Sequence, residues 1–243
     1  MIYAITSCGT NKLINEDAVL VGNTIVDTHV ENIKLEDRWV ICIADGVGGN
    51  AGGDLASRFV VNHLRNQLGD VNILEELRGS LVNINEQLLA YANGQAACKE
   101  MATTLTGVYC LDDNRYLFHI GNTRAYALQG KYLKQISEDH TVKEWLLRQG
   151  QFEEAENCNA SEITNCFGGG KDRLLSKLIV SPMENYRKLL LTSDGIHDYV
   201  DIETMEDVVG SGLPGIEMCE TIIQAARNNG SSDDASVVLI MEE

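Results

Sequence analysis

The chain alternates between short apolar runs bounded by turn residues and longer segments with apolar residues at helical spacing. Turn signals at 112–114 and 129–130 separate neighbouring runs and therefore predict antiparallel hairpins. Strands that arrive in pairs, instead of alternating singly with helices, argue against a Rossmann-type protein. Runs with the length and residue types of strands cover residues 2–7, 17–22, 38–44, 102–111, 115–120, 124–128, 132–136 and 236–241.

Helical periodicity is concentrated in a few segments between and after the strands. Asp54 is expected to cap the first helix, and Asn93-Gly94 to end the second. Residues 151–171 are the most loop-like stretch, and we expect them to form a segment that moves over a site. Apolar residues three and four positions apart predict helices around residues 59–68, 74–88, 142–149, 202–209 and 215–227.

Size and charge restrict the class of protein. The chain has 243 residues and no linker-like stretch, so we expect one domain spanning residues 1–243. Its formal net charge is −17, from 36 acidic and 19 basic residues. This balance argues against nucleic acid and against an anionic membrane surface as partners, and it suits metal cations and basic partner segments.

The cysteines and the first residues predict the cellular compartment. Seven cysteines include no C-x-x-C pair, and Cys42 and Cys110 lie inside apolar runs, as is typical of buried thiols in a reducing compartment. The N-terminal residues lack a basic segment followed by a long apolar one, and no stretch reaches about 18 apolar residues. We therefore expect a soluble, cytoplasmic protein.

Three aspartates far apart in the sequence stand where an apolar run meets a turn. Asp45 and Asp194 each follow such a run and precede glycine, and Asp233 stands just before the last run. A carboxylate at the end of a buried strand is costly unless a cation meets it. No Lys or Arg is adjacent to any of the three, so a metal ion with oxygen ligands is the expected partner.

The glycine-rich segment after Asp45 admits other interpretations. Gly46, Gly48 and Ala51 satisfy the dinucleotide fingerprint G-x-G-x-x-A. Against that hypothesis, Asp45 would face a pyrophosphate, and a second helix follows where a second strand ending in an acid is required. The segment is also compatible with a strand-to-helix turn in which glycines only supply unusual dihedrals. As a metal-binding loop, Asp45 offers a carboxylate, and Gly46 lets its own carbonyl approach the ion.

Six motifs in register change the balance between these hypotheses. Together they resemble PP2C-type metal-dependent protein phosphatases, especially the bacterial branch, and the resemblance covers essentially the whole chain. The motifs are Asn15-Glu-Asp17, Asp45-Gly-Val-Gly-Gly49, Met101-Ala-Thr-Thr-Leu105, Gly121-Asn-Thr-Arg124, Ser193-Asp-Gly-Ile196 and Ser232-Asp-Asp-Ala-Ser236.

The resemblance implies an α+β fold in four αββα layers, with two packed antiparallel sheets flanked by helices, which agrees with the order of hairpins. It also implies a two-metal centre for Mn²⁺ or Mg²⁺, in which a water bridging the ions attacks the phosphorus directly. By position, Asp45 bridges both ions, Asp194 and Asp233 complete the first ion's ligands, and the Gly46 carbonyl serves the second. Glu16, with Asp17 as a further candidate, is expected to hold metal-bound water.

Two positions depart from the family pattern. Lys12 stands where relatives usually carry an arginine that grips the substrate phosphate, and lysine lacks the fork geometry of arginine. Asn122 replaces an aspartate that helps to bind a third, weaker ion, so that ion is doubtful here. Asp234 replaces a common asparagine, and its expected role is turn formation.

The leading hypothesis is a Mn²⁺/Mg²⁺-dependent phosphatase acting on phosphoserine and phosphothreonine in proteins. The resemblance suggests a cytoplasmic Ser/Thr kinase as its opponent, and we expect a monomer that binds neither nucleic acid nor membrane. The alternative is a catalytically weakened PP2C-fold module that regulates or binds phosphoproteins, for which Lys12 and Asn122 are the motivation.

Overall fold

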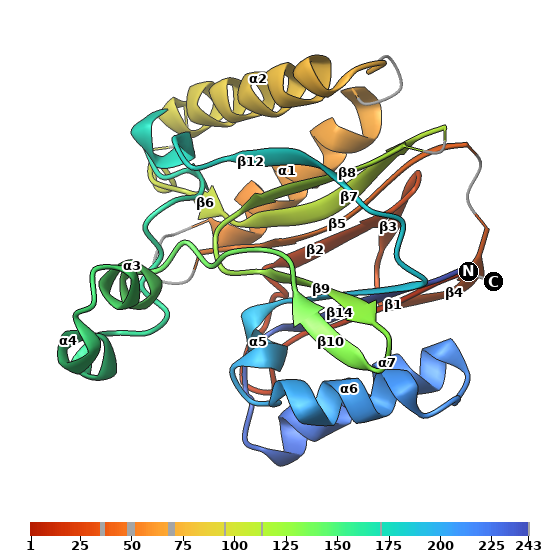
Figure 1. Ribbon diagram of the computed structural model, residues 1–243. Helices are drawn as coiled ribbons and strands as arrows, with labels where there is room; N and C mark the ends of the chain where they lie inside the picture. Colours follow the sequence, from red (N-terminus) through yellow and green to blue (C-terminus); the bar gives the residue numbers. More distant parts are fainter. Residues whose placement is uncertain are drawn as a thin grey trace.

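Two stacked antiparallel sheets lie between two layers of helices (Figure 1). The computed structural model describes residues 1–34, 37–47, 52–67, 71–94, 96–112, 114–170 and 172–242. The first sheet has the order β10 (Tyr132–Gln135), β9 (Arg124–Gln129), β13 (Lys188–Thr192), β14 (Ala235–Met241), β1 (Ile2–Ser7) and β4 (His29–Ile33). The second has the order β12 (Ile179–Met183), β8 (Asn114–Ile120), β7 (Leu105–Leu111), β5 (Arg38–Asp45), β2 (Asp17–Val21) and β3 (Thr24–Val26), and β11 (Phe167–Gly168) pairs separately with β6 (Ala102–Thr103).

Helices cover the outer face of each sheet. Side chains of the second sheet form one apolar cluster with α1 (Gly53–Gln67) and α2 (Leu74–Asn93). Side chains of the first sheet form another with α6 (Ile202–Gly210), α7 (Gly215–Asn228) and the short α5 (Asp194–His197). The helices α3 (Val142–Arg148) and α4 (Phe152–Asn157) project from one end of the sandwich (Figure 1), and a 3₁₀ turn covers Asp172–Leu175.

A third apolar cluster fills the space between the sheets and explains the continuous apolar runs in the sequence. On β2, Val19 and Val21 belong to this middle cluster, whereas Ala18 and Leu20 face the helix layer. Because both faces of the strand are covered, every residue of β2 is buried. The predicted four-layer α+β sandwich is confirmed.

Most of the predicted elements are present within a residue or two of their expected bounds. The pairs β7–β8 and β9–β10 are antiparallel, as the turn signals predicted, although Asp113 of the first turn lies outside the described residues. Residues 102–111 form two strands, β6 and β7, instead of one. Gly94 follows the last residue of α2, as predicted.

Some predictions about local structure were wrong. Asp54 lies inside the first turn of α1, which begins at Gly53, so it does not cap the helix. Residues 151–171 are not all loop, because α4 forms within them. β3, β4, β12 and α5 were not predicted from the sequence, because they are short or rich in polar residues.

The antiparallel pairing brings the functional segments to one end of the sandwich. On β2 and β5, Asp17 lies directly opposite Asp45 in the strand register. On the other sheet, the end of β13 and the start of β14 lie side by side, so Asp194 and Asp233 stand at neighbouring turns. Among the described helices, none combines the length and the apolar character that a membrane span requires.

Candidate metal centre

A cavity of about 270 Å³ collects the predicted site residues at this end of the sandwich. Its lining includes Lys12, Asp45, Gly46, Asp194 and Asp233, which come from both sheets and from four separate parts of the chain. The topology therefore brings together all three aspartates that the sequence singled out.

The backbone holds Asp45 firmly at the end of β5. Its carbonyl oxygen accepts hydrogen bonds from Thr103 Oγ1 and from the Thr104 amide, both at 2.8 Å. Gly46 continues the strand edge, and its amide donates to the Glu16 carbonyl at 3.1 Å. The last residue of the strand is thus fixed on both sides, so its side chain has a defined direction.

The carboxyl group of Asp45 is in an unfavourable electrostatic environment. It is a hydrogen-bonding neighbour of the Asp194 carboxyl, and its Oδ2 is buried without a partner among the described residues. Burial, followed by the charges of Asp194 and Asp17, raises the pKa of Asp45 well above its ordinary value. Such an arrangement requires either a shared proton or a cation.

Asp194 begins α5, directly after the buried strand β13. Burial raises the pKa of its carboxyl, and the charge of Asp233 adds to the effect. Asn122 Nδ2 donates to its Oδ2 at 3.1 Å. A side chain at Gly195 would collide with the Asp234 backbone carbonyl, so the glycine of this motif is required for the close approach of the two turns.

Asp233 differs from the other two aspartates, because a cationic side chain already meets it. Lys12 Nζ lies 2.5 Å from Asp233 Oδ1, 3.0 Å from Asp234 Oδ2 and 3.2 Å from Glu16 Oε2. Partial burial lowers the pKa of Lys12, but the hydrogen bonds with Asp233 and Asp234 outweigh it, and the net shift is upward. At Asp233 a lysine that is distant in the sequence is thus a partner, whereas for Asp45 and Asp194 no ion pair forms within the described residues.

Asp17 connects the two sheets through hydrogen bonds. Its Oδ2 accepts from Ser193 Oγ at 2.7 Å and from Ser236 Oγ at 2.6 Å, both on the opposite sheet. Burial raises its pKa to about 7, although the two serine hydroxyls work in the opposite direction. Its Oδ1 is buried without a partner among the described residues.

Asp234 has a larger role than the turn formation that we expected. Its Oδ1 accepts from the Gly9 amide, and its Oδ2 from the Glu16 amide, both at 2.8 Å. With the Lys12 contact, these bonds hold the β1–β2 loop against the turn that carries Asp233. The Asp234 side chain is 3% exposed, so its carboxylate forms a buried ionic contact between the two segments.

A second cavity of about 210 Å³ adjoins the first and contains Asn122, Arg124, Asp139 and Asp198 in its lining. Arg124 Nε and Nη2 bind the Asp139 carboxylate at 2.9 and 2.6 Å. Asp198 lines both cavities, and burial followed by the charge of Asp194 raises its pKa to about 6. Asp198 was not predicted as a site residue, although its position four residues after Asp194 is the spacing of neighbours on one helical face.

The segment after α4 reaches the first cavity. Asn159, Ser161 and Ile163 all belong to its lining. The prediction that residues 151–171 lie over a site agrees with this position, although Lys171 lies outside the described residues. Gly48 and Ala51, on which the dinucleotide hypothesis rested together with Gly46, lie outside the described residues.

A comparison with protein families bears on the fold and family hypotheses. The sequence profile of the family described as Protein phosphatase 2C matches residues 7–230. The chain belongs to the Protein phosphatase 2C family. This confirms the resemblance that the motifs carried.

Bacterial phosphatases are among the relatives of this PP2C chain. Protein phosphatase PhpP of Streptococcus pneumoniae serotype 2 is 29% identical over 246 residues, covering 98% of this chain and 96% of the relative. The Serine/threonine phosphatase stp of Listeria welshimeri is 30% identical over 214 residues, covering 84% and 85%. The PP2C chain is therefore a member of the metal-dependent Ser/Thr phosphatases.

Solved structures agree over the whole chain. The phosphatase Stp1 of Staphylococcus aureus has a TM-score of 0.84 and 26% identity, covering 100% of this chain and 94% of the other. The catalytic domain of the phosphatase PstP, crystallised in complex with two manganese ions, has a TM-score of 0.78 and 26% identity, covering 98% of each chain.

The side chains of this PP2C chain fit hard divalent cations. Its donors are carboxylate and carbonyl oxygens, which Mn²⁺ and Mg²⁺ prefer. Asp45 Oδ2 is buried without a partner among the described residues and the carboxyl lies beside Asp194, so a bound cation would relieve the repulsion at this place. Within the described residues, no three His, Cys, Asp or Glu side chains already form a closed group of ligands. At Asp233, the Lys12 ammonium engages one of the three carboxylates.

Proposed function

We propose that this chain hydrolyses phosphoserine and phosphothreonine in proteins, using two divalent cations held at the end of the sandwich. The observation that carries the proposal is the buried contact of Asp45 with Asp194 in a cavity that Asp233 also lines. Membership of the Protein phosphatase 2C family supports the reaction class.

Asp45 is proposed to bridge both ions, Asp194 and Asp233 to complete the first, and the Gly46 carbonyl to serve the second. Glu16 contacts Lys12, which lines the same cavity. We propose that Glu16 holds a water molecule that is bound to an ion. Asp17 is better suited to fixing the spacing of the two sheets, because both serine hydroxyls bind it from across the gap. Manganese and magnesium both suit these donors, and manganese is the ion to try first.

When bound, paired cations supply Lewis-acid activation of the attacking water and neutralise charge on the phosphoryl group. The side chains of this protein then bind and orient the phosphorylated substrate. Lys12 offers ammonium donors to phosphate oxygens at the cavity wall. Asn122 offers only a neutral amide to the third, weaker ion, so we expect two ions to bind.

The substrates are proposed to be phosphoproteins, with a Ser/Thr kinase as the opposing enzyme. We further propose a monomeric, cytoplasmic protein with residues 1–243 acting as one catalytic domain. A weakened, regulatory PP2C module is the second candidate, favoured by the ion pair between Lys12 and Asp233, which occupies a proposed metal ligand.

The test is release of phosphate from a phosphothreonine peptide, with manganese and with chelator, by the wild type and by Asp194→Ala. We expect the variant to lose more than the roughly 10–100-fold that removal of an outer-shell metal partner costs. Asp207→Asn, on an exposed position of α6, is the matched control and should retain full activity. Equal phosphate release by wild type and Asp194→Ala would refute the assigned centre, and a wild type inactive at every manganese concentration would favour the regulatory module.

A further inference from the structure

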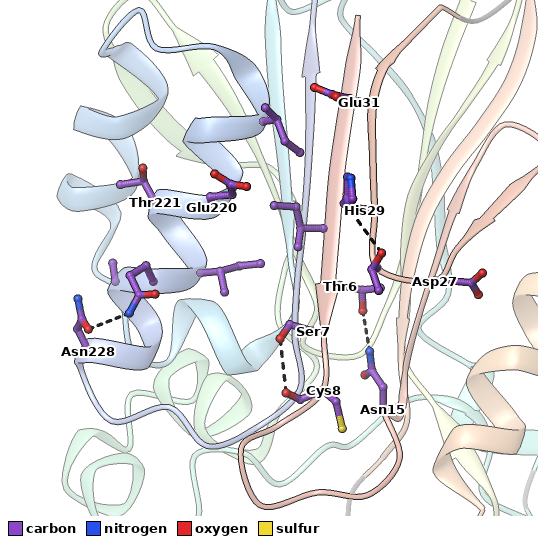
Figure 2. Close-up of a pocket in the computed structure, with 16 residues that line it drawn as sticks. Thr6, Ser7, Cys8, Asn15, Asp27, His29, Glu31, Glu220, Thr221 and Asn228 are labelled. Atoms are coloured by element: carbon purple, nitrogen blue, oxygen red, sulfur yellow. Dashed lines mark hydrogen bonds between the residues drawn. The ribbon is translucent and has the colours of Figure 1, made fainter.

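A groove that is lined at one end by Cys8 and Asn15 of the β1–β2 loop is larger than the metal cavity. It has a volume of about 1180 Å³, against about 270 Å³ for the cavity at the aspartates. Figure 2 shows it between α7 and the strands β1 and β4. Nothing in the phosphatase reaction described above uses this groove.

The groove exists because α7 covers the first sheet incompletely. The helix packs on β1 and β14, whereas β4 is the last strand of the sheet. Strand register places His29 of β4 beside Ile5 of β1, and both side chains line the groove. Together with Ile216 and Ile223 of α7, Ile5 gives the groove an apolar floor of half-buried side chains.

The rim of the groove is acidic. Asp27, Glu31 and Glu220 line it and are exposed, and no lysine or arginine of the described segments belongs to the lining. Within the described part of the chain, none of these three carboxylates forms an ion pair. An apolar floor with an unpaired acidic rim is complementary to a segment that carries both aliphatic and cationic side chains.

The groove also leads toward the metal centre. Cys8 and Asn15 line its end, and they lie at the two ends of the loop that carries Lys12. A polypeptide lying along β4 and α7 is thus directed to the loop that borders the proposed phosphate site.

We propose that the groove binds an extended, lysine- or arginine-rich segment of the phosphoprotein substrate, remote from its phosphorylated residue. The inference rests on the proposed function for the identity of the partner, and on the groove itself for the chemistry of recognition. A second copy of this chain is a poor occupant, because each copy carries a net charge of −17.

Direct binding tests the groove without any reaction. The probe is a fluorescein-labelled, unphosphorylated peptide with alternating lysine and isoleucine, titrated with the manganese-loaded protein and followed by anisotropy. Neutralising two rim positions in the double variant Glu31→Gln/Glu220→Gln should weaken binding about fivefold, since each exposed charge pair makes a modest contribution. Thr221→Trp, which places bulk in the groove from an exposed position, should weaken it as well.

The double variant Glu75→Gln/Glu86→Gln is the matched control, because it removes the same charge from exposed positions of α2. It should bind the probe within about twofold of the wild type. Equal weakening by both double variants would overturn the proposal, because it would show that net charge alone attracts the peptide. Unchanged binding by the groove variants would overturn it too.

Kinetics link the groove to the reaction. A short phosphothreonine peptide is compared with the same peptide extended by the basic segment. We expect a lower KM for the extended peptide, lost in Glu31→Gln/Glu220→Gln, with kcat unchanged and the short peptide unaffected. If neither peptide is hydrolysed, the proposed function fails, whereas the anisotropy result still decides whether the groove binds basic segments. If both are hydrolysed with equal KM, the groove's role in substrate recognition is refuted.

Discussion

Lys12 Nζ lies 2.5 Å from Asp233 Oδ1, so the side chain expected to grip phosphate is paired with a side chain expected to bind metal. The pair joins residues near the two ends of the chain, and Asp234 and Glu16 surround the same ammonium. An ammonium and a divalent cation compete for one carboxylate. Metal affinity and phosphate binding should therefore both depend on this one contact.

Replacing Lys12 should separate these two effects. Lys12→Met removes the competing ammonium, so we expect manganese to bind about three- to tenfold more tightly, while the KM for a phosphopeptide rises. Lys12→Arg should lower the KM relative to the wild type, because its guanidinium can hold two phosphate oxygens. Calorimetric titration with manganese and steady-state kinetics measure the two quantities. An unchanged KM in both variants would show that Lys12 has only a structural role.

Asn122→Asp should make stability depend more strongly on metal. The variant replaces the amide that donates to Asp194 Oδ2 with a second carboxylate in the same buried place. We expect a loss on the order of 1–2 kcal/mol in the free energy of unfolding with chelator present, and a larger gain on adding manganese than the wild type shows. Denaturant unfolding under both conditions measures this. An equal manganese response in the two proteins would contradict it.

Arg227 should be a positioning residue for Asp233. Its guanidinium donates to the carbonyl oxygens of Asp233 at 2.6 Å, Ser231 at 3.2 Å and Cys8 at 3.2 Å. Arg227→Met therefore releases both the Asp233 turn and the β1–β2 loop, and we expect a loss on the order of 2 kcal/mol in stability.

The readout specific to positioning is a weaker affinity of Arg227→Met for manganese at a temperature where the variant is fully folded. Arg65→Met is the control, since Arg65 is exposed on α1 and bonds only to Asn62 of the same helix among the described residues. Loss of stability with unchanged manganese affinity would show that Arg227 only supports the fold.

His140 should make the protein less stable in mild acid. Its Nδ1 accepts from the Gly121 amide at 3.1 Å, and burial, followed by the neighbouring His119, lowers its pKa from 6.5 to about 4. Between those values the unfolded chain binds more protons, so the free energy of unfolding falls as the pH drops. The expected loss from His140 between pH 7.5 and pH 5 is about 2 kcal/mol.

His140→Asn keeps an acceptor for the Gly121 amide but cannot titrate, so the difference between wild type and variant isolates this contribution. The subtraction also removes the opposite effect of carboxyls with raised pKa, such as Asp17, which favour the folded state in acid. Urea unfolding at a series of pH values, with chelator present, measures the difference. Parallel curves for the two proteins would contradict the prediction.

The sequence predicted the layers and the residues at the site because both depend on local patterns. Continuous apolar runs such as β2 and β5 are typical of strands covered on both faces, and the aspartates mark where such runs end. Short polar strands escaped prediction. β4 has the sequence HVENI and is mostly exposed, so nothing in its pattern distinguishes it from a loop; only its pairing with β1 makes it a strand.

Contacts between residues that are far apart in the sequence could not be predicted from sequence patterns. No periodicity relates Lys12 to Asp233 or Asp17 to Ser236, because these distances are set by how the two sheets stack. Asp234 was taken for a turn residue for the same reason: its partners, the amides of Gly9 and Glu16, belong to the opposite end of the chain.

The proposed ligands are divided between the sheets, with Asp45 at the end of β5 and Asp194 and Asp233 beside β13 and β14. A cation bound by all three would link the two sheets at this end of the sandwich, so metal loading should slow proteolysis and amide exchange there more than at the far end, where the two termini lie. Local protection at one end of the molecule would then measure how fully the site is loaded with metal.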